Sequence, residues 1–249
     1  MIPIKAIILA AGKGTRMKSD LPKVLVPACG RPLVDYVLDA VNAVGIEETI
    51  VVVGYRAELV RRALADRPGV KFCEQTEQLG TGHAVQMCRG ELDHFDGGVL
   101  VLTGDSPLTQ IDSLNHLIDL FQSERPACVM GTLLHEDATG LGRIVRDAND
   151  RFLAIVEEKD ATEQQKKIKE VNMSTYLFDC RALVGVLDRL NNDNKQGEFY
   201  ITDCPGILKS DGLDVRALAV LKPCEALSIN TVEDLRIVEK EMRQIECEN

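Results

Sequence analysis

Residues 6–17 read AIILAAGKGTRM, a continuous apolar run that leads directly into a glycine-rich loop. Such an uninterrupted aliphatic run is typical of a strand buried on both faces of a parallel sheet. Glycines placed after the strand let backbone amides approach a ligand closely, because glycine has no Cβ. The stretch therefore predicts a buried first strand over residues 6–10, followed by a loop that can bind phosphate oxygens.

After this loop the sequence alternates between helical and extended patterns. Apolar residues at three- and four-residue steps, or in continuous runs, predict helices and strands in turn over residues 34–44, 49–53, 59–64, 70–73 and 99–103. The alternation predicts an α/β fold with a Rossmann-like, doubly wound and mostly parallel sheet. Ligands of such sheets bind at the carboxyl ends of the strands. We therefore expect a site that combines the glycine-rich loop with the segment after residue 103.

The pattern changes at about residue 143. Residues 143–146 and 152–157 flank the turn-forming sequence DAND at 147–150, which predicts a β-hairpin. Later segments predict a helix, a strand and a final helix, over residues 183–190, 215–220 and 235–245. The second part of the chain is therefore expected to form a smaller, mixed lobe that faces the substrate.

Charge and composition exclude several classes of protein. The formal net charge of −10 argues against nucleic-acid binding, so any polyphosphate must be held by a local site of amides, cations and a metal ion. The 8 cysteines form no CxxC pair, so neither a zinc site nor a disulfide framework is expected. The sequence has no membrane-spanning run and no signal peptide, which predicts a cytoplasmic, unanchored protein.

The glycine-rich loop permits more than one interpretation. A tight turn explains GKG at 12–14 without any ligand, and the segment is neither a Walker A loop nor a dinucleotide fingerprint, because Met17 occupies the third glycine position. Arg16 and Lys23 place two cations beside the loop. They are either solvated surface charges or partners of an electrophilic phosphorus and a leaving pyrophosphate, and a cationic pair suits the second role better.

Asp105 follows a buried strand in the sequence LTGDSPL at 102–108. A carboxylate at the carboxyl edge of a sheet can bind a hard cation such as Mg²⁺. Aspartate ahead of Pro107 is equally suited to cap the N-terminus of a helix. The residues alone leave both roles open.

A set of ordered motifs resembles the bacterial N-acetylglucosamine-1-phosphate uridylyltransferase family. The segments are LAAGKGTRM (9–17), SDLPKVL (19–25), EQLGTGHA (77–84), LTGDSPL (102–108), TGLGRIVR (139–146), IVEEKDAT (155–162), EVN (170–172) and QGEFYITD (196–203). The resemblance covers essentially the whole chain and implies a nucleotide-diphospho-sugar transferase fold. Because the sequence has no linker-like stretch, we expect a single domain over 1–249, with a nucleotide-binding part over about 1–142 and a sugar-binding lobe with the last helix over about 143–249.

The same resemblance implies a set of nucleotide contacts. They are Leu9, Ala10, Ala11, Gly12, Gly14, Gln75, Gly80 and Thr81. A glutamine amide supplies both a donor and an acceptor for a pyrimidine edge. Loop and helix-cap chemistry is the alternative for Gln75 and Thr81, and we expect His83 to be structural.

The resemblance also implies sugar, metal and catalytic residues. The sugar contacts would be Thr103, Gly104, Gly142, Glu157, Asn172 and Asn230; Mg²⁺ would bind Asp105 and Asn230; and Arg16 and Lys23 would be catalytic. Each has a structural alternative: Gly142 permits a turn, Glu157 faces solvent on a strand, and Asn230 caps the last helix in a box with Glu233.

The implied reaction is the attack of N-acetylglucosamine 1-phosphate on the α-phosphorus of UTP, which releases pyrophosphate. The alternatives are a related enzyme for another pair, such as dTTP with glucose 1-phosphate, and a non-catalytic regulatory protein that binds nucleotide sugars. Some residues depart from the family pattern: Thr103 replaces tyrosine, Met173-Ser174 replaces Thr-Gly, and residues 228–231 match only loosely. The sequence has no hexapeptide repeats for a C-terminal β-helix, so we expect no acetyltransferase activity, and the oligomeric state stays open.

Overall fold

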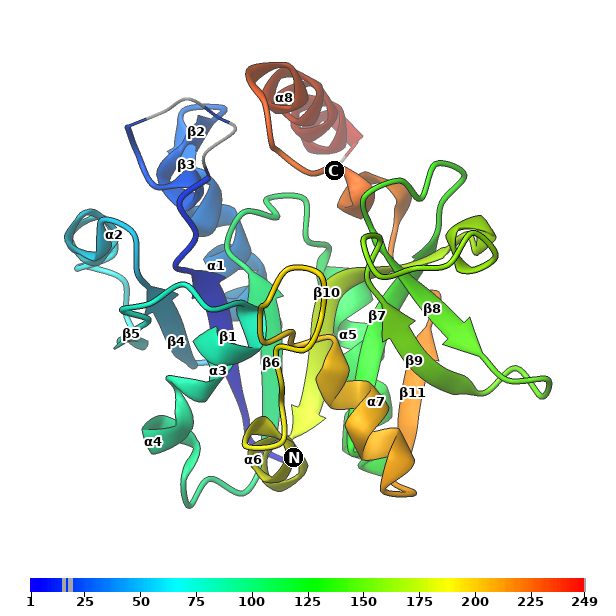
Figure 1. Ribbon diagram of the computed structural model, residues 1–249. Coiled ribbons are helices and arrows are strands. Elements are labelled where there is room, and N and C mark those ends of the chain that lie inside the picture. The colour runs from blue at the N-terminus through cyan, green and yellow to red at the C-terminus, as the bar shows by residue number, and fades with distance from the viewer. Residues whose placement is uncertain (15–16, 18–19, 249) are drawn as a thin grey trace.

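A computed structural model describes residues 1–14, 17 and 20–248 (Figure 1). Within these residues the main sheet has nine strands. Seven of them follow the order β11-β7-β10-β6-β1-β4-β5, and β8 and β9 extend the sheet beside β10. The bounds are β1 Ile4–Ala10, β4 Glu48–Val53, β5 Val70–Glu74, β6 Gly98–Thr103, β7 Cys128–Leu134, β8 Gly142–Arg146, β9 Phe152–Val156, β10 Glu170–Asp179 and β11 Val215–Leu218.

The strand directions confirm the predicted mostly parallel α/β sheet. β1 is parallel to both of its neighbours, β4 and β6, and β4 is parallel to β5. β10 is the exception on this path, because it lies antiparallel between β6 and β7. The predicted hairpin is also confirmed, as β8 pairs with β9 in antiparallel register.

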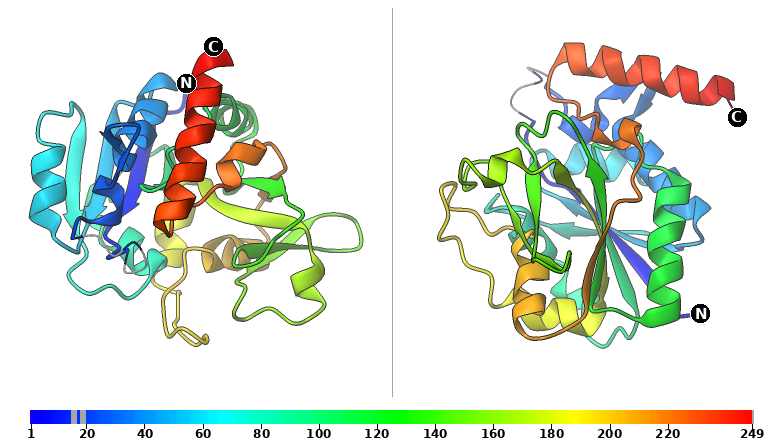
Figure 2. Two further views of the ribbon diagram at one scale, coloured as in Figure 1. Left: turned by 90° about the horizontal axis from the view of Figure 1, so that it is seen from above. Right: turned by 90° about the vertical axis from the view of Figure 1, so that its right-hand side faces the viewer.

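Helices cover both faces of the sheet, as Figure 2 shows most clearly in its right-hand view. One face packs against α1 (Leu33–Ala43), α2 (Ala57–Ala63) and α5 (Ile111–Glu124). The other packs against α3 (Thr81–Gln86), α4 (Arg89–Leu92), α6 (Cys180–Leu187) and α7 (Asp203–Ser210). Successive residues of β1 alternate between the two cores: Ile7 belongs to one cluster and Ile8 to the other. A strand buried on both faces needs the continuous apolar run that the sequence has.

A third apolar cluster lies beyond the carboxyl ends of the parallel strands. There α8 (Val232–Glu248) lies near β2 (Pro27–Ala28) and β3 (Arg31–Pro32) (Figure 1). Val238 and Met242 of α8 share the cluster with Ile229, which precedes the helix, and with Ala28 of β2. The short helix η2 (Lys23–Leu25) leads into the same region. The final helix therefore lies at the edge of the sheet where ligands of this fold bind.

Several elements depart from the sequence-based expectation. The predicted helix over 183–190 begins at Cys180, because the Asp179 carboxylate accepts a hydrogen bond from the Ala182 amide at 3.1 Å and caps it. β7, β10 and α5 were not predicted. Every cysteine whose side chain is described is a free thiol. No helix in the described part of the chain is long and apolar enough to cross a membrane.

Candidate functional site

A cavity of about 270 Å³ lies at the carboxyl ends of β1 and β6. Its walls come from the glycine-rich loop, the start of α3 and the loop after β6. Leu9, Ala11, Gly12, Gly14, Lys23, Val24, Gln75, Gln78, Gly80, Thr81, Ala84, Thr103, Asp105 and Glu198 line it. Most of the predicted nucleotide contacts thus share one cavity, at the place where the strand order predicts a site.

Lys23 joins three segments that are distant in the sequence. Its ammonium nitrogen lies 2.5 Å from Asp105 Oδ2 and 3.4 Å from Asn230 Oδ1. The Lys23 side chain is 16% exposed and that of Asp105 is 27% exposed, so water screens this pair less than a surface pair. The structure therefore brings a predicted catalytic cation and both predicted metal ligands together.

Gly14 allows this approach of Lys23 to the loop. Its φ of +61° is in the left-handed region, and a Cβ at this position would lie 2.6 Å from Lys23 Cβ. Any larger residue would displace the lysine from Asp105, which explains the glycine. The other predicted catalytic cation, Arg16, lies outside the described residues.

The helix-capping alternative for Asp105 is wrong. The next helix, α5, begins only at Ile111, and its N-cap position is Gln110. Asp105 lies five positions before that cap and pairs instead with Lys23. Its carboxylate is therefore available to a cation at the end of the strand.

The capping alternative for Asn230 is also wrong. Asp234 donates its amide to Thr231 Oγ1 at 3.1 Å, and its carboxylate accepts the amides of Asn230 and Thr231 at 2.9 and 2.8 Å. The capping box therefore consists of Thr231 and Asp234 rather than Asn230 and Glu233. Asn230 Nδ2 donates to Ser228 Oγ at 3.0 Å, which leaves the amide oxygen facing Lys23.

This assignment predicts different consequences for adjacent residues. Thr231→Ala should lower the free energy of unfolding by about 1 kcal/mol, because it removes the cap of α8. Asn230→Ala should leave stability nearly unchanged but weaken the binding of a divalent cation beside Asp105. Thermal melts and metal titrations of the two variants check this. A stability loss in Asn230→Ala equal to that of Thr231→Ala would contradict the assignment.

Gln75 is buried, with 3% of its surface exposed, and its amide is held in one orientation. Its Nε2 donates to the Gly80 carbonyl at 2.9 Å and lies 3.1 Å from His83 Nδ1. No described residue donates to the Gln75 amide oxygen, which thus remains an acceptor on this cavity-lining side chain. His83 contacts the Gln75 amide and so helps to hold its orientation.

Gly80 and Thr81 join the cavity to the segment at 198–202. A Cβ on Gly80 would lie 2.5 Å from the Phe199 carbonyl oxygen, and its φ is +114°. Thr81 Oγ1 accepts the Ile201 amide at 3.1 Å. Both residues line the cavity, but the hydroxyl oxygen of Thr81 is already engaged in the hydrogen bond that joins α3 to the segment at 198–202.

Three of the predicted sugar contacts meet on the neighbouring strands. Asn172 on β10 is in register with Gly142 on β8, and a Cβ on Gly142 would lie 3.5 Å from Glu157 Oε1. Asn172 Oδ1 accepts the Ser174 amide at 3.3 Å, and Ser174 has a φ of +55° at the bulge of β10. This serine takes a left-handed backbone, which costs a residue with a Cβ more than it would cost glycine.

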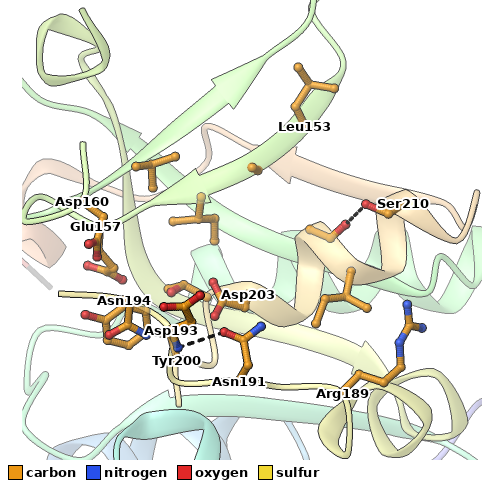
Figure 3. Close-up of a pocket in the computed structure, with 16 residues that line it drawn as sticks. Leu153, Glu157, Asp160, Arg189, Asn191, Asp193, Asn194, Tyr200, Asp203 and Ser210 are labelled. Carbon is orange, nitrogen blue, oxygen red and sulfur yellow. Dashed lines mark hydrogen bonds between the residues drawn. The ribbon is translucent and has the colours of Figure 1, made fainter. Parts of the chain in front are cut away.

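A second cavity of about 620 Å³ opens next to Glu157 (Figure 3). It lies between β9 and α7, and several of its lining groups are carboxylates, including Glu157, Asp160 and Asp203. Burial raises the pKa of both Glu157 and Asp203 above their usual values. The motif QGEFYITD supplies Tyr200, Thr202 and Asp203 to this wall, and none of the three was predicted as a site residue.

Some predicted contacts do not line either cavity. The Ala10 side chain packs in the core on the opposite face of the sheet from Ile7. Gly104 donates its amide to the Leu9 carbonyl at 2.9 Å and lies against Val24 and Ile8. These two residues support the loops around the cavity rather than form its wall.

The chain belongs to the MobA-like NTP transferase domain family, whose model matches residues 6–199. A solved structure, that of a UDP-glucose pyrophosphorylase complexed with UDP-glucose, has the same fold. The TM-score is 0.79 at 17% sequence identity, over 98% of this chain and 99% of that chain.

Curated relatives are more similar in sequence. The chain is 45% identical over 239 residues to the bifunctional protein GlmU of Streptococcus sanguinis (strain SK36) and 43% identical over 247 residues to that of Geobacillus sp. (strain WCH70). These alignments cover 96% and 99% of the chain, but only 52% and 53% of the relatives. The chain thus spans about half the length of the curated relatives that it matches.

Proposed function

We propose that the chain transfers a uridylyl group from UTP to N-acetylglucosamine 1-phosphate, releasing pyrophosphate and forming UDP-N-acetylglucosamine. The observation that supports this best is the meeting of Lys23, Asp105 and Asn230 beside the glycine-rich loop. The ordered motifs and the similarity to the GlmU proteins favour this pair of substrates over others.

The nucleotide would lie in the cavity of about 270 Å³. Because Nε2 of Gln75 is engaged with Gly80 and His83, its oxygen is left to accept a hydrogen bond. Uracil and thymine have a ring N–H at N3 that can donate this bond, whereas cytosine has an acceptor there. The orientation of Gln75 therefore supports a uracil or thymine nucleotide.

The residues around Lys23 fit a divalent cation. The Asp105 carboxylate and the Asn230 amide oxygen both face the Lys23 ammonium group, which supports a site for positive charge at this position. Oxygen donors are the ligands that Mg²⁺ prefers. In the described part of the chain no three His, Cys, Asp or Glu side chains gather at one point, so further ligands would come from phosphates and water. When bound, Mg²⁺ supplies charge neutralisation on the phosphates.

The protein's own contribution to the reaction is alignment and charge. A sugar phosphate is already ionised at neutral pH, so its attack on the α-phosphorus needs no general base. The amides of the glycine loop would hold the triphosphate, and Lys23 would stabilise charge that develops on the transferring and leaving groups. In the structure the Lys23 ammonium pairs with Asp105. To contact the phosphates of the substrate, it would therefore have to move part of the way from Asp105 toward them.

The sugar would bind where Gly142, Glu157 and Asn172 meet. The second cavity adjoins Glu157, and its carboxylates repel an anion, so this wall suits the hydroxyl and N–H donors of a sugar ring rather than its phosphate. We therefore expect the sugar on the side of Glu157 and the phosphates on the side of Lys23.

Glu157→Gln should raise the stability of the protein while it weakens sugar binding. Burial raises the pKa of Glu157 in the folded protein above its usual value of 4.5. The unfolded chain therefore ionises first as the pH rises, and folding stability falls between the usual and the raised pKa. At pH 7 the variant should have a higher Tm than the wild type, and this difference should disappear below about pH 4.

The same variant should bind the sugar phosphate more weakly, with a KM raised by about tenfold or more, because an amide cannot replace both carboxylate acceptors. Melting curves from pH 4 to 8 and steady-state kinetics measure both effects. A Tm below that of the wild type at pH 7, or an unchanged KM, would contradict the role given to Glu157.

The proposed function is tested by a matrix of nucleoside triphosphates against sugar 1-phosphates, scored by pyrophosphate release. UTP with N-acetylglucosamine 1-phosphate should give the highest kcat/KM. A higher value for dTTP with glucose 1-phosphate would support a related enzyme instead. Binding of UDP-sugars without turnover at any Mg²⁺ concentration would support a regulatory protein.

A further inference from the structure

A buried arginine on β8 has no part in the reaction described above. The side chain of Arg143 is only 2% exposed, and arginine is almost never buried this deeply unless it is paired. Its Nη2 lies 2.7 Å from Glu158 Oε2, and its Nη1 donates to the Leu141 carbonyl. Nη2 also donates to the Lys166 carbonyl at 3.5 Å. The guanidinium group therefore connects the start of β8 with the segment that follows β9.

Two of these acceptors lie directly next to the proposed sugar contacts. Leu141 precedes Gly142 in the chain, and Glu158 follows Glu157. A Cβ on Gly142 would lie 3.5 Å from Glu157 Oε1, so the two sugar contacts are close together in space. Arg143 thus binds the immediate neighbour of each of them.

Backbone pairing alone does not hold Glu157 against β8. The ladder between β8 and β9 ends with the pair Arg143 and Val156. Glu157 and Glu158 lie beyond this pair, and the Glu157 carbonyl accepts two amides of the turn that follows, both at 2.9 Å. The ion pair between Arg143 and Glu158 is therefore a link between the two strands beyond the end of their ladder.

Stability alone does not explain an arginine at this position. The Arg143 Nε is buried and has no hydrogen-bond partner in the described part of the chain. An unpaired buried donor is costly, and apolar side chains of similar volume often replace buried ion pairs without a loss of stability. Arginine is better suited to fix geometry, because its planar fork binds two acceptors in set directions.

We propose that Arg143 is a positioning residue of the sugar site, which sets the distance between Gly142 and Glu157 through its bonds to Leu141 and Glu158. The sugar would contact Gly142 and Glu157, and Arg143 itself would not touch it. The inference rests on the proposed function, since it names a further residue that acts on the same site.

Arg143→Lys tests the inference. Lysine keeps the positive charge, but its single ammonium group cannot bind both acceptors in the geometry of the guanidinium fork. The KM for the sugar 1-phosphate should rise about three- to tenfold, as expected for the loss of one hydrogen bond, while kcat and the KM for UTP stay within about twofold. A purely structural role would lower the Tm without this difference between the two KM values. An unchanged KM for the sugar phosphate, or an equal rise in both KM values, would overturn the proposal.

Glu158 provides a second test that does not depend on the folding of Arg143→Lys. Its side chain is 28% exposed, so the structure should tolerate a change there more easily. Glu158→Ala removes the acceptor and should raise the KM for the sugar phosphate about three- to tenfold. Glu158→Gln keeps an amide oxygen for Arg143 Nη2 and should restore this KM to within about twofold of the wild type. A wild-type KM in Glu158→Ala, or no restoration in Glu158→Gln, would overturn the proposal.

Arg146→Lys is the matched control on the same strand. The Arg146 Nε pairs with Glu170 Oε2 at 2.7 Å, and its Nη2 donates to the Ala217 carbonyl at 2.8 Å. Neither partner is a chain neighbour of Gly142 or Glu157. The variant should therefore have a lower Tm, while both KM values stay within about twofold of the wild type. A rise in the KM for the sugar phosphate in this variant would show that any weakening of β8 has this effect, and would overturn the proposal.

The two proposals can fail separately. If the wild type binds UDP-N-acetylglucosamine in calorimetry but never releases pyrophosphate, the proposed function falls. Arg143 is then tested by the affinity for UDP-N-acetylglucosamine, which should drop about three- to tenfold in Arg143→Lys but not in Arg146→Lys. If the wild type binds no nucleotide sugar, both proposals fall.

Discussion

Lys23→Met should slow turnover about 10²- to 10³-fold at saturating substrates, because it removes a preorganised cation from the place where charge develops. The methylene stem of methionine replaces most of the lysine's packing against Gly14, so the fold should persist. The Lys23–Asp105 pair is partly exposed, and its loss should have only a small effect on the Tm. Steady-state pyrophosphate release and a thermal melt measure both quantities.

Mg²⁺ binding distinguishes this role from a general loss of structure. The Lys23 ammonium occupies the oxygens of Asp105 and Asn230 that we assign to the metal. Lys23→Met should therefore bind Mg²⁺ at least as tightly as the wild type, even though it turns over slowly. Lys71→Met is a suitable control, because Lys71 is an exposed lysine that pairs with Glu91 at 3.0 Å on another edge. A variant that lost metal binding together with turnover would count against the arrangement.

Local sequence patterns were sufficient for the parallel strands β1, β4, β5 and β6 and for the two loops that follow β1 and β6. Strand β1 and its loop follow from an apolar run and small residues, and Asp105 from its position at the end of another run. Because the carboxyl ends of adjacent parallel strands meet, the loop and Asp105 had to lie close together.

The position of Asn230 could not be read from local patterns. It depends on the segment η4 (Pro223–Ala226), which the Glu225 carboxylate attaches to α5 through Ser113 Oγ at 2.6 Å and the Gln110 amide at 3.1 Å. These are contacts between residues more than a hundred positions apart, so only the resemblance, not periodicity, could suggest Asn230.

The strand β10 was missed for a different reason. Its alternation breaks at the bulge between Asn172 and Thr175, where Ser174 has a positive φ. It also runs antiparallel between parallel strands, which no alternation of helices and strands predicts. The second cavity depends on how α7 packs against β9, and its residues Tyr200 and Thr202 were therefore not identified from the sequence.

Asp105→Asn is the substitution that should affect the metal most strongly. It keeps the shape of the side chain but removes the negative charge that attracts a divalent cation, and no cluster of other carboxylates in the described part of the chain replaces it. Loss of even an indirect metal partner commonly costs about 10- to 100-fold in affinity, and a direct ligand should cost at least as much. The Mg²⁺ concentration for half-maximal turnover should therefore rise by at least about tenfold.

The control for Asp105→Asn is Asp112→Asn. Asp112 is an exposed carboxylate in the first turn of α5, and its Oδ2 pairs with Lys222 Nζ at 2.8 Å. Both variants lose one negative charge and one salt bridge, so a change in the net charge of the protein affects them equally. Only Asp105→Asn should shift the Mg²⁺ titration. Mn²⁺ accepts the same oxygen ligands, so a titration with Mn²⁺ should also shift more in Asp105→Asn than in Asp112→Asn. Equal shifts in the two variants would mean that Asp105 acts through the overall electrostatic field of the protein and not as a ligand of the metal. A shift confined to Asp105→Asn would locate the cation beside Lys23, where it can neutralise a departing pyrophosphate.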